Sequence, residues 1–327
     1  MLRVLNGIKG GKFLVVGRVG MDFCPDPPGT PVQLGEVFVA GMGGSAANTA
    51  AGLVKLGQEA ALVTCVSDDA VGDFCRQQLK NYDIDDRYVR TIQGEERTSL
   101  AVYESRLEDH KTVIYRNNAA DFRMDLADVE AVDYGEFTAL ITAGTVFAAE
   151  PSRAATFRAF ELARAAGIPI IFDVDYRPYS WSSAEEAENL LGRAAALSVV
   201  IVSNDEEFGF IAGDISEGRN AARKLAEGHT EIVVYKRGPE GAVTLTDNQE
   251  IIAGIYPIEA LKPPGAGDSF MAGFLASIAQ GHALKEAILR GSACASIVVS
   301  KVGCAPAMPY PDELEAFLRA HPGPTSV

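Results

Sequence analysis

A turn of small residues near the C-terminal end of the chain leads into a carboxylate. The letters PPGAGDSFMAGFL cover residues 263–275, and Gly265, Ala266 and Gly267 precede Asp268. The first N–H groups of a helix have no partner, so such a turn is typical of an anion site. Asp268 could simply cap the helix. It could also take a proton from a hydroxyl that attacks a phosphoryl group, and the pairing therefore favours phosphoryl transfer.

Other polar residues follow predicted buried strands. Asp22 comes after the apolar run 13–16, with a glycine turn between them, and Arg177 comes after the strand IPIIFDV at 168–174. Ligands bind at the carboxyl ends of strands in open α/β sheets, so these side chains are placed to meet a polar ligand. Asp22 could equally be a turn-former.

Two arginines could share one ligand. Arg116 ends the run KTVIYR and Arg177 follows the strand at 168–174. Guanidinium groups bind carboxylates in a planar fork, so two of them in one pocket would suit an acid sugar. A solvated surface charge is the alternative for Arg116.

The elements that would position these residues alternate between strand and helix. Strands are expected at 59–66, at 137–144 and in 198–208 before Asn204, and two antiparallel strands in 230–247 around a turn at 236–241. Helices are expected at 151–167, 184–197 and 283–303. This pattern predicts a doubly wound α/β fold. The runs 97–105 and 111–117 alternate apolar and polar residues and predict a hairpin, which with a short strand at 32–40 would form a small separate sheet. A plain surface hairpin is the alternative.

Composition limits the class of protein. The 327 residues carry a net charge of −15, which argues against a nucleic-acid or anionic-membrane partner. Five scattered cysteines without a CxxC pair favour reduced thiols and a cytoplasmic location, and the four histidines have no ligand spacing. No apolar run reaches membrane-spanning length.

The stretch 41–69 allows a rival interpretation. Gly41, Gly43 and Ala46 fit a G-x-G-x-x-A pattern, and Asp68 or Asp69 follows about twenty residues later. Taken alone, the pattern predicts a dinucleotide-binding unit and an NAD(P)-dependent oxidoreductase.

The same letters carry a resemblance to a known family. Residues 262–275 resemble the C-terminal signature of the ribokinase-like (PfkB) carbohydrate kinases, and Gly43, Gly44, Asn48 and Gly57 resemble the N-terminal signature, although Ser67 stands where a further glycine is expected. The resemblance implies one ribokinase-like domain over 1–327: a doubly wound sheet flanked by helices, with a small β-sheet lid from about 24–40 and 97–117. It also implies a homodimer through that lid.

The resemblance further implies a role for each site residue, with ATP and Mg²⁺ as cofactors. Gly265, Ala266 and Gly267 would form the anion hole, with Asp268 as the base. The sugar would be bound by Asp22, Gly43, Gly44, Asn48, Arg116, Asp175 and Arg177. The nucleotide would lie against Lys236, Arg237 and Gly238 of the KRG turn and against Gly303 and Ala305 in the stretch 293–305. Asn204 and Glu207, an N-x-x-E element, would order Mg²⁺ through water.

The expected reaction is phosphorylation of a primary hydroxyl of a sugar or sugar acid. Local strings such as YRNNAADF and FDVDYRPYSW most resemble family members that act on 5-dehydro-2-deoxy-D-gluconate, an acid of inositol breakdown. The alternative substrate is 2-keto-3-deoxygluconate, and a catalytically silent sugar-binding protein is a third interpretation. Cation-activated members carry an Asp and a Thr where this chain has Lys262, Pro263 and Pro264, so no potassium site is expected.

Overall fold

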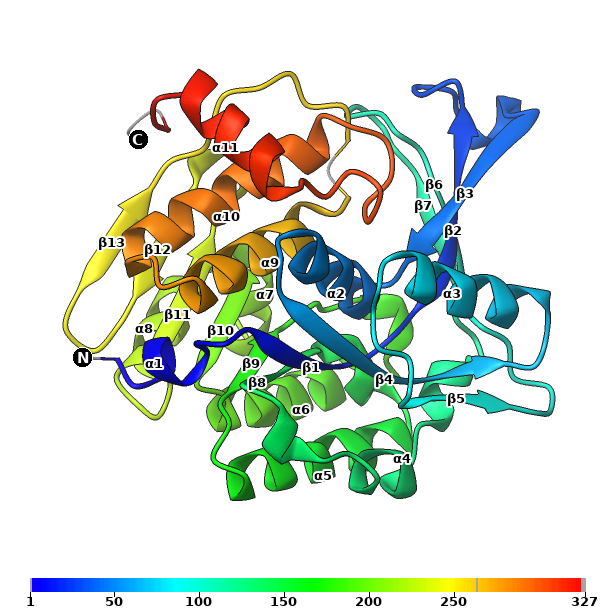
Figure 1. The fold of residues 1–327 in the computed structure, drawn as a ribbon, viewed down its shortest axis with the longest axis horizontal. Helices are drawn as coiled ribbons and strands as arrows, with labels where there is room; N and C mark the ends of the chain where they lie inside the picture. The colour runs from blue at the N-terminus through cyan, green and yellow to red at the C-terminus, as the bar shows by residue number, and fades with distance from the viewer. Residues whose placement is uncertain (1, 263, 325–327) are drawn as a thin grey trace.

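A sheet of nine strands forms the centre of the protein (Figure 1). The computed structural model describes residues 2–262 and 264–324, so Pro263 of the predicted signature lies outside the described residues. Seven neighbouring strands run parallel, β12 is antiparallel to them, and β13 is antiparallel to β12 at the edge. The order is β13 (Glu250–Ala253), β12 (Ala242–Leu245), β11 (Ile232–Lys236), β10 (Val200–Asn204), β9 (Ile170–Asp173), β8 (Ala139–Ala143), β1 (Lys12–Val16), β4 (Glu59–Ser67) and β5 (Val89–Ile92).

Helices cover both faces of this sheet because its strands are apolar on both sides. In β1, Phe13 and Val15 enter one hydrophobic core, whereas Leu14 and Val16 enter the other. The first core is closed by α2 (Ser45–Lys55), α3 (Ala70–Asn81), α9 (Ala266–Ala279), α10 (Leu284–Val299) and α11 (Pro311–Ala320), with the short α1 (Val4–Gly7) at its margin. The second is closed by α4 (Leu126–Glu130), α5 (Ser152–Ala165), α6 (Ala184–Leu197), α7 (Asp205–Ile211) and α8 (Gly218–Ala226). The doubly wound prediction is confirmed.

A second, four-stranded sheet stands off the main one (Figure 1). Its order is β3 (Val37–Gly43), β2 (Gly20–Asp26), β6 (Leu100–Tyr103) and β7 (Thr112–Tyr115). The hairpin predicted over 97–117 is present as β6 and β7, which pair antiparallel.

The prediction for residues 20–43 is confirmed only in part: residues 37–40 of the strand expected over 32–40 lie in β3, and the rest differs. Asp22 lies within β2 rather than in a turn, and Gly41 and Gly43 lie within β3. Residues 32–34, expected in a strand, form a single 3-10 turn. Antiparallel pairing of β2 with β3 supplies the hydrogen bonds of these glycine-containing segments, and local sequence carries no sign of that pairing.

The dinucleotide-binding hypothesis is also wrong. The strand before α2 is β3, which belongs to the small sheet, whereas the strand after α2 is β4 of the main sheet. A dinucleotide-binding unit needs two parallel strands of one sheet on either side of the helix. Asp69 instead caps α3 by accepting from the N–H groups of Val71 and Gly72.

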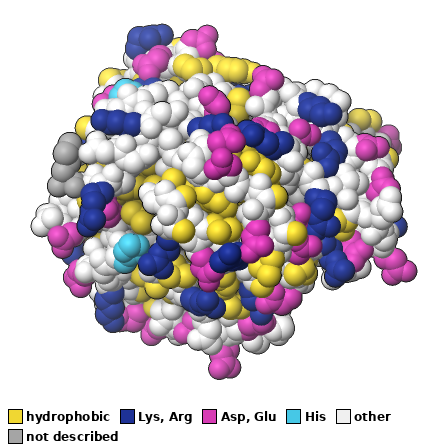
Figure 2. Space-filling view, turned by 60° about the horizontal axis from the view of Figure 1, so that its bottom comes forward, with side chains coloured by type: hydrophobic (Ala, Val, Ile, Leu, Met, Phe, Trp, Pro, Cys, Tyr) yellow, Lys and Arg dark blue, Asp and Glu magenta, His cyan; other side chains and the backbone are white. Residues whose placement is uncertain are grey.

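The surface mixes charges of both signs. Figure 2 shows acidic side chains interspersed with lysine and arginine over the face on view, with no continuous basic patch there. None of the helices in the described part of the chain combines the length and apolarity needed to cross a bilayer.

Candidate active site

A cavity of about 1140 Å³ opens between the carboxyl edge of the parallel strands and the small sheet. Strands β6 and β7 contribute Tyr103 and Ile114 to one wall, opposite the ends of β9, β10 and β11. The structure brings most predicted site residues together here: Asp22, Gly44, Asn48, Arg116, Asp175, Arg177, Asn204, Glu207, Lys236, Gly238, Gly265, Ala266, Gly267 and Asp268. Gly43, Arg237, Gly303 and Ala305 do not line it.

The N-terminus of α9 faces this cavity. Gly265 precedes the helix in the left-handed conformation, with φ of 89°, where a side chain would be strained. The first amide bonded inside the helix is that of Ser269, which donates to the Gly265 carbonyl at 3.1 Å. The amides of residues 265–268 precede that first bond, and these four residues line the cavity, so the amides can bind an anion there.

Asp268 does not cap α9, which overturns the simpler interpretation of this residue. Gly265 is the N-cap and Asp268 is the third helical residue. Its Oδ2 accepts a hydrogen bond of 2.9 Å from Nδ2 of Asn48 on α2. Helices α2 and α9 can lie this close because Gly52 faces Ala272: a Cβ on Gly52 would come within 2.6 Å of the Ala272 Cβ.

The pKa of Asp268 is raised to about 6. Burial is the main cause, and the negative charge of Asp175 adds to it. The hydrogen bond from Asn48 and the charges of Arg177 and Lys236 oppose the rise. A carboxylate with such a pKa is ionised at neutral pH and is a stronger base than an ordinary aspartate.

Two hydrogen-bond acceptors in the cavity lack partners within the described residues. Asp22 Oδ1 and Asn48 Oδ1 are both buried and accept no hydrogen bond from the protein. Burial also raises the pKa of Asp22 to about 6, against the charges of Arg18 and Lys262. Unpaired buried acceptors are costly, so both oxygens fit a ligand that brings hydroxyl donors.

Gly43 has a different use from the one expected. A Cβ at this position would lie 1.8 Å from Asp22 Oδ1, so the glycine leaves space for the Asp22 carboxylate rather than for the ligand itself. Gly44, with φ of 98°, lies against the carbonyl of Arg18, which a Cβ would approach to 2.4 Å.

The predicted carboxylate-binding arginines already have acidic partners. Arg177 pairs with Asp175 at 2.6 Å and lies 3.5 Å from Glu207. Burial alone would raise the pKa of Asp175, but Arg177 and the hydroxyl of Ser45 together outweigh it and lower that pKa. The backbone of Asp175 has a positive φ of 37°, a strained conformation at the end of β9.

Arg116 is held in a similar way. Its guanidinium pairs with Asp121, donates to the carbonyl of Thr145 at 3.0 Å and lies 4.1 Å from the ring of Phe122. The side chain is buried and lines the cavity, but part of its guanidinium is already occupied by these protein contacts.

Asn204 and Glu207 form a capping box at the start of α7. Asn204 Oδ1 accepts from the N–H of Glu207 at 2.8 Å, and Glu207 accepts from Ser203 Oγ at 2.6 Å and from the N–H of Tyr176 at 3.2 Å. Within the described residues no group of three acidic, histidine or cysteine side chains could hold a metal ion. Asn204 and Glu207 therefore fit a Mg²⁺ that is bound mainly by phosphates and water and that the two side chains contact only through water.

Lys236 and Asp173 flank the anion turn. A Cβ on Gly267 would lie 3.3 Å from Lys236 Nζ and 4.0 Å from Asp173 Oδ2. Burial raises the pKa of Asp173 to about 7; Lys236 opposes the rise, and the nearby carboxylates of Glu207 and Asp175 add to it. The cation of Lys236 therefore lies where an anion held by the turn would need it.

The predicted nucleotide residues lie partly elsewhere. Arg237 donates to the carboxylate and carbonyl of Glu240, and Ala305 accepts from Lys55. From the stretch 293–305 the cavity is lined by Ala295, Ser296, Val299 and Cys304.

A family model for pfkB family carbohydrate kinases matches residues 11–311. The chain belongs to this family. It is a carbohydrate kinase, and the oxidoreductase and silent-binding interpretations are set aside. This PfkB kinase is 36% identical over 312 residues to 5-dehydro-2-deoxygluconokinase of Geobacillus thermodenitrificans, covering 94% of the chain and 93% of that relative. It is 34% identical over 310 residues to the enzyme of that name from Photobacterium profundum, covering 93% and 94%.

Solved structures agree with the fold of the PfkB kinase. A fructokinase double mutant from Vibrio cholerae O395, with fructose, ADP and a potassium ion bound, superposes with a TM-score of 0.83 at 25% identity, covering 95% of this chain and 99% of that one. Fructokinase with bound ATP from Xylella fastidiosa gives 0.84 at 19% identity, covering 94% and 98%.

Sequence reasoning missed several residues of the PfkB kinase cavity. Arg18, Asp173, Tyr179, Lys262 and the segment 255–258 all line it. Arg18 and Asp173 follow or end parallel strands, so the rule that pointed to Asp22 could also have found them. The segment 255–258 precedes the anion turn and has no local signal.

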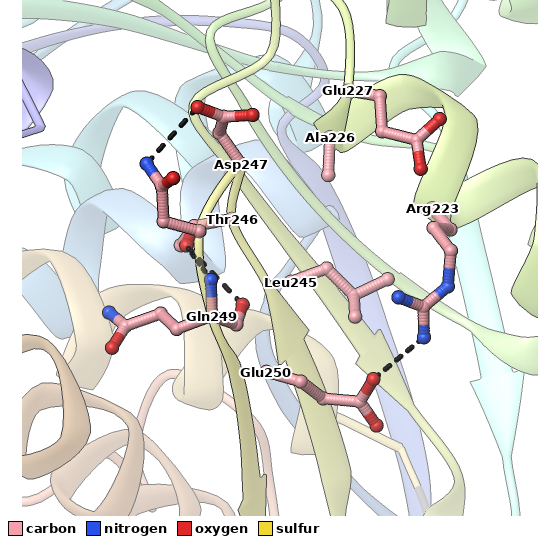
Figure 3. Close-up of a pocket in the computed structure, with 9 residues that line it drawn as sticks. Arg223, Ala226, Glu227, Leu245, Thr246, Asp247, Gln249 and Glu250 are labelled. Atoms are coloured by element: carbon pink, nitrogen blue, oxygen red, sulfur yellow. Dashed lines mark hydrogen bonds and ion pairs between the residues drawn. The ribbon is translucent and has the colours of Figure 1, made fainter.

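A smaller cavity of about 310 Å³ in the PfkB kinase contains none of the predicted site residues. It lies beside α8 and the β12–β13 hairpin (Figure 3). Arg223, the basic residue that lines this cavity, donates a hydrogen bond of 2.7 Å to Glu250. The larger cavity is therefore the candidate active site.

Proposed function

We propose that this kinase transfers the γ-phosphoryl group of ATP to a primary hydroxyl of a sugar acid, 5-dehydro-2-deoxy-D-gluconate, with Asp268 as the general base. The observation that carries the proposal is the meeting of Asp268, the free amides of residues 266–268 and the unpartnered acceptors of Asp22 and Asn48 in one cavity. The base, the phosphoryl site and the acceptor-binding site are then adjacent.

Asp268 would take the proton of the attacking hydroxyl. Its raised pKa gives it proton affinity, and the hydrogen bond from Asn48 fixes the carboxylate against rotation. The amides of Gly265, Ala266 and Gly267, with the ammonium of Lys236, would stabilise charge on the transferring group. Positioning and electrostatics then supply the catalysis, and no covalent intermediate on the protein is needed.

Asp22 and Asn48 would accept hydrogen bonds from sugar hydroxyls. Gly43 supports this contact by leaving room for the Asp22 carboxylate, and Gly44 brings the start of α2 against the end of β1. Arg116 and Arg177 would contact the acid end of the sugar, and Asp175 would contact the sugar elsewhere in the cavity.

ATP would lie along Lys236 and Gly238 toward the apolar wall formed by α10. Arg237, Gly303 and Ala305 would support this site from behind, because they lie next to lining residues without lining the cavity themselves. Mg²⁺, when bound, would neutralise phosphate charge, with Asn204 and Glu207 reaching it through water.

The choice of substrate is supported by the relatives named 5-dehydro-2-deoxygluconokinase at 34–36% identity over nearly the whole chain. It is also supported by the arginines of the cavity, which a neutral sugar would not need. 2-Keto-3-deoxygluconate is the second candidate, because it offers the same carboxylate.

A coupled ADP-release assay across sugar acids and neutral sugars tests this proposal. We expect turnover to be highest with 5-dehydro-2-deoxygluconate. Asp268→Asn should lower kcat by about 10²–10⁴-fold while changing sugar affinity little. An active Asp268→Asn variant would exclude the base assignment, and turnover confined to neutral sugars would exclude the acid substrate.

The small sheet is proposed as a lid, over about 24–40 and 97–117, and as a homodimer contact. Val37, Phe38 and Val39 of β3 and Val113 and Tyr115 of β7 are exposed. Exposed apolar residues on the edge strands of a sheet are typical of interfaces. Light scattering on the wild type and on Phe38→Glu tests the dimer, which the variant should dissociate.

A cytoplasmic location is proposed from the cysteines. All five are buried and none forms a disulfide. Reduced thiols of this kind are usual where glutathione and thioredoxin keep cysteine reduced. Subcellular fractionation, followed by detection of the protein in each fraction, would test the location.

A further inference from the structure

Arg18 is a buried cation without an acidic partner. It lies between β1 and β2, where the chain passes from the main sheet to the small sheet, and 9% of it is exposed. Two other arginines are as deeply buried, and each has a carboxylate: Arg116 pairs with Asp121, and Arg290 pairs with Glu315 at 2.7 Å. Across residues 2–262 and 264–324, no ion pair includes Arg18.

The guanidinium of Arg18 makes one hydrogen bond within the described chain. Its Nη1 donates to Ser99 Oγ at 2.8 Å, and Ser99 is itself buried. Nε and Nη2 of Arg18 donate no hydrogen bond to the described residues, and Arg18 lines the cavity. A guanidinium has five N–H donors in a planar fork, and most of these donors are therefore free for a ligand.

Arg18 belongs to the sugar half of the cavity. Its carbonyl lies against Gly44, at the start of the helix that carries Asn48. Its charge lowers the pKa of Asp22 and of Asp175, and both of these residues line the same cavity as Arg18. It is not part of the anion turn at α9.

We propose that Arg18 binds the carboxylate of the sugar acid and so selects acids over neutral sugars. The inference rests on the proposed function and adds a specificity-determining residue to it. An unpaired buried guanidinium carries a desolvation cost that an anionic ligand offsets. The cavity then complements a sugar acid at both ends, because the free acceptors of Asp22 and Asn48 face hydroxyl donors and the free donors of Arg18 face the carboxylate.

Steady-state kinetics of the wild type and Arg18→Met with three substrates test the inference. The substrates are 5-dehydro-2-deoxygluconate, its uncharged carboxamide, and fructose 1-phosphate as an anion of another kind. Arg18→Met should raise KM for the acid by about 100-fold and lower kcat much less, since a charge-assisted fork is lost from binding. With the carboxamide, kcat/KM should change by less than about threefold, because no charge is paired there.

Two further variants control for structural damage. Arg290→Met removes a buried arginine outside the cavity and should leave KM for the acid within about twofold of the wild type. Arg18→Lys keeps the positive charge but lacks the planar guanidinium, so its KM should lie between those of the wild type and Arg18→Met. The lysine variant replaces the methionine variant in this test if Arg18→Met melts at a much lower temperature.

The outcomes separate this inference from the proposed function. A wild type that phosphorylates neutral sugars and no acid would defeat the proposed function. A wild type active on the acid, with Arg18→Met at wild-type KM, would defeat the inference alone. Equal losses of kcat/KM with the acid and the carboxamide would show that Arg18 acts through its shape and not its charge. A wild type that prefers fructose 1-phosphate would show that the site binds a phosphate and not a carboxylate. Either result would overturn the assignment.

Discussion

Asn48 and Asp268 are 220 residues apart in the chain, and a hydrogen bond of 2.9 Å joins the amide nitrogen of the first to the carboxylate of the second. The bond connects α2 to α9, so it links the sugar-binding half of the cavity to the anion turn. It is donated to the ionised form of Asp268 and lowers the pKa of that carboxyl, against the larger effect of burial.

Asn48→Ala should slow the reaction and shift its pH dependence. Without the donor, the pKa of Asp268 rises above its value of about 6, so the acid limb of kcat/KM should move to higher pH. We expect kcat/KM at pH 7.5 to fall by about 10–100-fold. Asn48→Asp, which places a second negative charge there, should shift the limb further; a variant with an unmoved limb would contradict the role of this bond.

The acid limb of the wild-type pH profile should report Asp268 together with the sugar-binding Asp22, since both have a pKa of about 6. The base must be deprotonated, and its pKa is about 6, so kcat/KM should be level above pH 7 and fall by at least about tenfold per pH unit below pH 6. Initial rates between pH 5 and 9, with a coupling enzyme kept in excess, measure the pH dependence of kcat/KM. A profile that is flat down to pH 5 would exclude this carboxylate as the base.

Gly43→Ala should displace Asp22 and weaken sugar binding. The added Cβ would lie 1.8 Å from Asp22 Oδ1, so the carboxylate must move away from its present place. KM for the sugar should rise by about tenfold or more. Gly41→Ala is the matched control in the same strand, because its Cβ would have no atom within 4 Å; equal effects of the two variants would refute the explanation.

Asp22→Asn should stabilise the fold at neutral pH. The pKa of Asp22 rises on folding from 3.8 to about 6, so the folded state holds this proton more tightly and stability is lost as pH rises from about 4 to about 6. At pH 7.5 the variant should exceed the wild type in free energy of unfolding by on the order of 2 kcal/mol, and by less at pH 4.5.

Urea unfolding at the two pH values measures this difference. Asp26→Asn is the control, since Asp26 is exposed at the end of the same strand and its carboxylate is not removed from water on folding. A stability difference for Asp22→Asn that stays constant with pH would contradict the assigned pKa.

Turnover should not depend on a monovalent cation. Lys262 is fully buried, and its ammonium donates to the carbonyl of Pro264 beside the anion turn. A cationic donor at this position cannot act as an oxygen ligand for potassium. We expect kcat to vary by less than about twofold between potassium, sodium and tetramethylammonium salts at equal ionic strength. Strong activation by potassium alone would show that the ion binds despite Lys262.

The sequence by itself determined the family, the doubly wound sheet and the residues that could take part in binding or catalysis. The Gly265–Asp268 turn could be identified because it depends on a local constraint, the free amides at a helix start, whereas Asn48 and the N-x-x-E element were identified through their resemblance to family signatures. These features need only a few neighbouring residues, and the sequence displays them directly.

The tertiary structure decided which of these groups meet. The use of Gly43 became visible only when β2 paired with β3 and placed Asp22 above it. The role of Asp268 as a held base rather than a cap required α2 to pack on α9, and the unpaired state of Arg18 required the positions of every carboxylate around it. Such contacts join residues far apart in the chain, so burial and partner choice are properties of the folded protein alone.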